Sequence, residues 1–131
     1  MPEVKLSVPA RPDYVHVLRQ VTAGVAARLR FSYDEIEDLR LAIGEACAYL
    51  LGVRPSATAL TLLVTSDEPT ARIEAVTIAT GSDSTPGEGS PQEGIIWHIL
   101  GALTDDAHFE QLPEGPGIRF TKAHSVESTQ G

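Results

Sequence analysis

The sequence has little of what defines several large classes of protein. It holds one cysteine, Cys47, in 131 residues, so no disulfide can form within the chain, which suits a reducing cytosol. Ten Lys and Arg stand against eighteen Asp and Glu, and a net charge of −8 excludes a generic DNA- or RNA-binding face. Three Phe, three Tyr and one Trp provide no stacking platform for single-stranded nucleic acid.

Long apolar runs and metal-ligand spacings are also missing. No run approaches the roughly 20 residues that cross a bilayer, and the first residues lack a signal-peptide pattern, so we expect a soluble, cytoplasmic protein. The four histidines follow no zinc-type spacing, and we expect no metal. An apolar content of 42% is enough for the core of one domain, which we place at residues 1–124, with a flexible tail at 125–131.

The first half of the chain predicts one strand and two helices. Residues 3–8 alternate polar and apolar side chains, which is typical of a half-buried strand, and residues 14–30 carry apolar residues at helical spacing. Ser32 and Glu35 form an S-x-x-E capping box that begins a second helix, which ends near Gly52. Its apolar stripe includes Cys47, which we expect to be a small buried hydrophobe rather than a redox sensor.

The second half predicts two strand pairs around a third helix. Residues 57–66 and 71–80 form a hairpin, a loop follows at 81–92, and a helix covers 93–104. Two further strands lie near 106–112 and 117–122. The order β-α-α-β-β-α-β-β predicts an α+β fold, a two-layer sandwich with the helices on one face of a mixed sheet.

The segment from Val4 to Leu51, above all its stretch DEIEDLRLAIGEAC, resembles bacterial anti-sigma factors of the serine-protein-kinase type. These proteins belong to the GHKL, or Bergerat-fold, histidine-kinase-like ATPase superfamily. The later segment IIWHILGALTDDAHFE resembles the last helix and following strand of the same family. The resemblance implies a homodimer that holds a sigma factor, with an anti-anti-sigma protein competing for the same surface. Active members bind ATP and Mg²⁺ and phosphorylate a serine of that competitor.

The family's helix motif, E-x-x-x-N, is only half retained. Glu45 occupies the position of the general base, although a solvated carboxylate on an amphipathic helix is an alternative reading. The position of the Mg²⁺-binding Asn holds Tyr49, and a bulky neutral phenol is a poor ligand for this small, hard cation.

The family's two glycine motifs are also altered. In D-x-G-x-G, Ala79 stands where the adenine-binding Asp is expected, and Gly81 is retained. In the later G-x-G, Gly94 is retained and Ile96 replaces the second glycine. Trp97, next in the chain, is expected to be a core residue that also fills the adenine position. These changes predict a degenerate nucleotide site.

Arg19 aligns with the family's sigma-contacting arginine, on the polar side of the first helix with His16 and Gln20. An arginine can bridge partner carboxylates, and a solvated surface Arg is the alternative. The leading hypothesis is therefore an anti-sigma factor that needs no cofactor. The alternatives are an active serine-protein kinase that uses ATP and Mg²⁺ with Glu45 as base, and a scaffold protein with neither activity.

Overall fold

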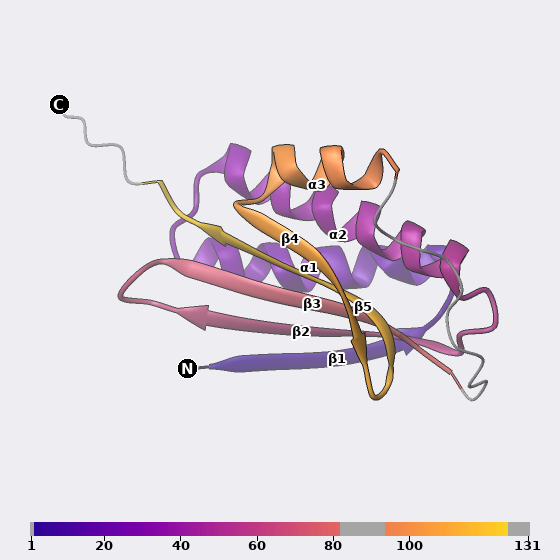
Figure 1. Ribbon diagram of the computed structural model, residues 1–131. Coiled ribbons are helices and arrows are strands. Elements are labelled where there is room, and N and C mark those ends of the chain that lie inside the picture. Colours follow the sequence, from indigo (N-terminus) through magenta and orange to yellow (C-terminus); the bar gives the residue numbers. More distant parts are fainter. Residues whose placement is uncertain (1, 82–93, 126–131) are drawn as a thin grey trace, which may run out of the picture.

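The fold is a five-stranded sheet with three helices on one of its faces (Figure 1). The computed structural model describes residues 2–81 and 94–125. Its elements are β1 (Glu3–Pro9), α1 (Pro12–Arg28), α2 (Tyr33–Val53), β2 (Ala59–Asp67), β3 (Arg72–Thr80), α3 (Ile96–Leu103), β4 (Asp106–Leu112) and β5 (Gly115–Ala123). The predicted element order and two-layer architecture are confirmed.

The sheet has the strand order β1-β2-β3-β5-β4 and is antiparallel at every pair. The expectation of a mixed sheet is wrong. The reason lies in the connections, because the chain reverses direction three times between β1 and β2, once after β1, once after α1 and once after α2 (Figure 1). The chain therefore enters β2 opposite to β1. In the same way, α3 and β4 separate β3 from β5 and leave that pair antiparallel.

Backbone conformation sets three helix boundaries that the apolar pattern misplaced. Pro12 is accepted in the first turn of α1, so the helix begins before residue 14. The helix ends at Arg28 and not at residue 30, because Arg30 has a left-handed φ of 66°. The helix α3 begins at Ile96, after Gly94 with φ of 117°. The predicted loop 81–92 beyond Gly81 and the predicted tail beyond Ser125 lie outside the described residues.

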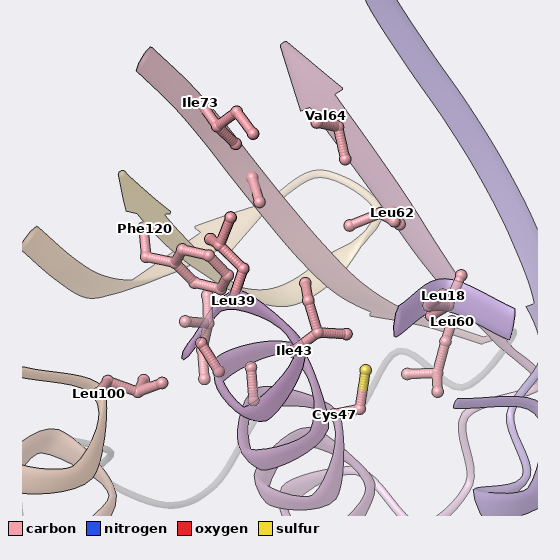
Figure 2. Close-up of a cluster of buried hydrophobic side chains, with 14 of the residues drawn as sticks. Leu18, Leu39, Ile43, Cys47, Leu60, Leu62, Val64, Ile73, Leu100 and Phe120 are labelled. Carbon is pink, nitrogen blue, oxygen red and sulfur yellow. The ribbon is translucent and has the colours of Figure 1, made fainter. Parts of the chain in front are cut away.

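The core lies between α2 and the sheet, as Figure 2 shows. The inner stripe of α2 is fully buried, and it meets alternate residues of β2, β3 and β5. Members of this cluster include Leu39, Ile43, Cys47, Leu60, Leu62, Ile73 and Phe120. Burial raises the pKa of the Cys47 thiol to about 12, which supports the expected role as a hydrophobe, since the thiol stays protonated. Within the described residues, no helix is long and apolar enough to span a membrane.

The N-terminus of α2 is tied to the end of β5 by one carboxylate. The predicted capping box is present, with the Ser32 hydroxyl accepting from the Glu35 amide at 3.1 Å and Glu35 Oε1 accepting from the Ser32 amide at 2.7 Å. Glu35 Oε1 also lies 2.7 Å from His124 Nδ1, and Oε2 accepts from the Ser125 amide at 2.8 Å. We call Glu35, His124 and Ser125 the latch.

The latch makes stability depend on acid pH. Burial raises the pKa of Glu35, but hydrogen bonds from Ser125, Ser32 and His124 lower it by more. The net effect is a pKa of about 2 instead of the ordinary 4.5. The stabilisation is therefore complete above pH 4.5 and is lost as the pH falls toward 2. We expect Glu35→Gln to lower the free energy of unfolding at neutral pH by about 2 kcal/mol.

Urea denaturation across this pH range measures the effect. The matched control is Glu37→Gln on the same helix, whose carboxylate is more exposed and pairs with Arg40 at 3.6 Å. A Glu35→Gln variant as stable as the Glu37→Gln variant at neutral pH would contradict the role of the latch.

Candidate functional site

A groove of about 550 Å³ runs between α1 and α2. We call it the α1–α2 groove. Four residues of α2 with small or apolar side chains line one wall, namely Leu41, Gly44, Ala48 and Leu51, and Glu45 lies among them. The opposite wall comes from α1 and consists of Pro12, Asp13, Val15, His16 and Arg19. The groove therefore combines apolar walls with a few charged groups, which is the usual composition of a binding site.

Arg19 lies against α2 instead of pointing freely into solvent. An ideal Cβ built on Gly44 would be 3.9 Å from both Cδ and Nε of Arg19, so the missing side chain of this glycine leaves room for the arginine stem. Arg19 Nε is buried and has no hydrogen-bond partner within the described residues. Arg19 is therefore half-buried and not a fully solvated surface residue, because its helix packs on a neighbour that has no side chain at the point of contact.

The two other predicted partner contacts are placed differently. His16 is exposed and lines the α1–α2 groove. Gln20 is exposed but does not line it, and its side-chain oxygen accepts a hydrogen bond from the Arg40 guanidinium. Gln20 thus links α1 to α2 in the free protein. The structure brings Arg19, His16 and Glu45 together in one groove and leaves Gln20 beside it.

Tyr49 lies on α2 one turn after Glu45 and contacts α3. Its ring meets the ring of Trp97 edge to face, with the centroids 6.3 Å apart and an interplanar angle of 63°. Burial raises the pKa of the Tyr49 phenol, so this group stays neutral at ordinary pH. Both rings pack against the core cluster. The predicted Mg²⁺ position is therefore held by a neutral aromatic side chain in contact with Trp97.

The remaining positions of the predicted nucleotide site lie on β3 and before α3. Ala79 is fully buried in the core cluster. Gly81 comes directly after β3 and lies close to the backbone before β2, since an ideal Cβ on Gly81 would be 3.1 Å from Ala57 Cα. Gly94 is exposed, and its φ of 117° favours glycine.

Two of these positions lack the polar groups that the family resemblance implies for binding ATP and Mg²⁺. The methyl group of Ala79 cannot accept a hydrogen bond from adenine, and the phenol of Tyr49 is not a charged oxygen ligand. Within residues 2–81 and 94–125, no group of three His, Cys, Asp or Glu side chains could hold a metal ion.

The sequence reasoning missed the α2 wall of the groove. Its signal is a second stripe at positions 41, 44, 48 and 51, which repeats every three or four residues beside the core stripe. This stripe is hard to recognise in the sequence, because Gly44 and Ala48 have small side chains that add little to the apolar pattern of the helix. The helix α2 therefore has one face for the sheet and another for α1 and the groove.

The antiparallel sheet with its layer of helices has the fold of a solved domain and fits the GHKL-type fold that the sequence predicts. A solved structure supports this class, namely the RsbU and RsbW domains of a Mycobacterium tuberculosis protein, with a TM-score of 0.70 and 14% identity. The match covers 94% of this chain and 32% of that one. No family profile matches the sequence.

Two relatives are more specific, and both are named serine-protein kinase RsbW. The protein from Bacillus cereus strain B4264 is 27% identical over 135 positions, which covers 92% of this chain and 84% of the relative. The protein from Bacillus subtilis strain 168 is 50% identical over 44 residues, or 34% of this chain and 28% of that protein. These relatives confirm the predicted resemblance to anti-sigma factors of the serine-protein-kinase type.

Proposed function

We propose that this chain is an anti-sigma factor that binds a sigma factor at the α1–α2 groove. The observation that carries the proposal is Arg19, which lies in the groove with a buried Nε that has no partner among the described residues. A guanidinium in this state can gain a charge-assisted hydrogen bond when a partner carboxylate arrives. The similarity to RsbW proteins supports a sigma factor as that partner.

The charge of the chain supports the same partner. The net charge of −8 is complementary to the basic, promoter-reading surfaces of a sigma factor, and such complementarity speeds association and excludes acidic partners. By the family resemblance, the proposal includes a homodimer in the cytoplasm and release of the sigma factor by an anti-anti-sigma protein.

The proposal also holds that nucleotide is not needed. Ala79 offers no acceptor to adenine, and Tyr49, which stands in the position of the Mg²⁺-binding Asn, contacts Trp97 edge to face. A second candidate function is an active serine-protein kinase that phosphorylates an anti-anti-sigma protein. Glu45, at the position of the general base, favours this candidate, as do the names of the relatives.

The test measures calorimetric binding of each purified sigma factor of the source organism, with and without millimolar ATP and Mg²⁺. We expect one sigma factor to bind with the same affinity in both conditions. Arg19→Ala should weaken this binding about thirtyfold, since a buried interface arginine contributes roughly 2 kcal/mol. The fold should remain intact, because Arg19 is half-buried in the groove and its stem lies beside Gly44 of α2.

Arg72→Ala is the matched control, since Arg72 is exposed at the start of β3, away from the groove. Binding that requires ATP would favour the kinase. Equal binding by the Arg19→Ala and Arg72→Ala variants would place the interface elsewhere.

A further inference from the structure

Two opposite charges share the α1–α2 groove without neutralising each other. Arg19 and Glu45 both line it, on α1 and α2 respectively. Within residues 2–81 and 94–125, neither side chain takes part in an ion pair or a side-chain hydrogen bond. Asp13, the other carboxylate of the groove, already pairs with Arg11 at 3.2 Å. The groove therefore presents one uncompensated cation and one uncompensated anion.

The surroundings of these charges are apolar. Leu41 is 48% exposed, although it is a large hydrophobic residue, and Val15, Ala48 and Leu51 extend the apolar lining. Covering such a surface removes apolar area from water and strengthens the charges inside it. An occupant that supplied no opposite charges would leave buried ions unpaired, which would weaken its binding.

An amphipathic helix meets these requirements. Its apolar stripe can lie along Leu41, Ala48 and Leu51, which follow one another at helical spacing on α2. Side chains on either side of that stripe can carry opposite charges to the two walls of the groove. A strand would instead need a sheet edge, and the groove is formed by two helices.

We propose that Glu45 is a partner-recognition residue, and that the groove seats an amphipathic helix of the sigma factor with a carboxylate against Arg19 and a Lys or Arg against Glu45. This inference rests on the proposed function, since it names what the sigma factor presents to the groove. It assigns to Glu45 a contact that depends on its charge and not on nucleotide.

The experiment reverses one charge at a time and measures affinity for the sigma factor that binds the wild-type chain. Glu45→Lys should weaken binding tenfold or more, and Glu45→Gln by a smaller factor. The matched control is Glu114→Lys, because Glu114 is exposed in the turn between β4 and β5 and undergoes the same change of charge. That control should change affinity less than about threefold, as expected of a distant exposed charge.

A rescue identifies the contact. Each Lys and Arg of the sigma factor is replaced by Glu in turn, and one replacement should restore binding to the Glu45→Lys variant while weakening binding to the wild type. Circular dichroism confirms folding of each variant, and Glu45→Gln, which keeps the size of the side chain, provides the result if Glu45→Lys does not fold.

The outcomes separate the two proposals. If no sigma factor binds the wild-type chain, the proposed function fails. If Arg19→Ala weakens binding but Glu45→Lys and Glu45→Gln behave like Glu114→Lys, the proposed function stands and the role of Glu45 is overturned. Weakening by Glu45→Lys together with rescue by one sigma-factor variant supports both.

Discussion

An aspartate at position 79 is expected to lower the free energy of unfolding by about 3 kcal/mol and to create no ATP binding. Ala79 is fully buried among apolar residues of the core cluster, and burying a carboxyl group without a partner costs a few kcal/mol. The family resemblance suggests the opposite result, namely that Asp in this position restores a contact with adenine. We expect the loss of stability without ATP binding, because Tyr49 and Trp97 remain packed against the same core cluster.

Denaturation in urea measures the loss of stability, and calorimetry with ATP and Mg²⁺ measures binding. Ala102→Asp is the matched control, since Ala102 is exposed on α3 and the same chemical change there should cost less than about 1 kcal/mol. An Ala79→Asp variant that is stable and binds ATP with a micromolar dissociation constant would show that the nucleotide pocket persists, and would favour the kinase.

Gly115→Ala is expected to lower the free energy of unfolding by 3 kcal/mol or more. Gly115 begins β5 with a φ of 148°, which L side chains rarely adopt. A Cβ there would lie 2.2 Å from the carbonyl oxygen of Ala79, far inside van der Waals contact. Because the obstacle is backbone in the next strand, relief requires separating β5 from β3 at this end.

Thermal and urea denaturation again provide the measurement. Gly101→Ala is the control, since a Cβ on this helical glycine would meet nothing within 4 Å and should leave stability unchanged or higher by up to about 1 kcal/mol. Equal stability of the Gly115→Ala and Gly101→Ala variants would mean that β5 shifts at no cost, and that its pairing with β3 is looser than the register indicates.

Local sequence patterns predicted most of the fold. The order of the eight elements follows from apolar periodicity and turn residues, and the capping box at Ser32 fixed the start of α2 because all its atoms lie within one turn. The direction of the strands did not follow, since it depends on how many reversals separate two neighbours. The second role of Glu35 also escaped prediction, because His124 lies 89 residues away in the sequence.

In the candidate site, the sequence predicted motif positions from the identity of single residues, but it did not predict contacts between different helices. Motifs suggested site positions for Glu45, Tyr49 and Ala79, which remain predictions, and gave no information on the surroundings of these residues. The half-burial of Arg19 depends on the absence of a side chain at Gly44, on another helix. The contact of Tyr49 with Trp97 joins α2 to α3, two helices that are far apart in the sequence. The role of Arg19, His16 and Gln20 in binding a partner remains a prediction.

The two-helix connection between β1 and β2 has a consequence for how the protein folds. Hairpins β2–β3 and β4–β5 pair residues that are close in sequence, whereas Val8 in β1 must find Leu60 in β2 across both helices. Loop-closure entropy disfavours this distant pairing until α1 and α2 have formed and shortened the separation. We therefore expect β1 to join the sheet last on the folding pathway and, at the sheet edge, to be the strand whose amides exchange with solvent most readily.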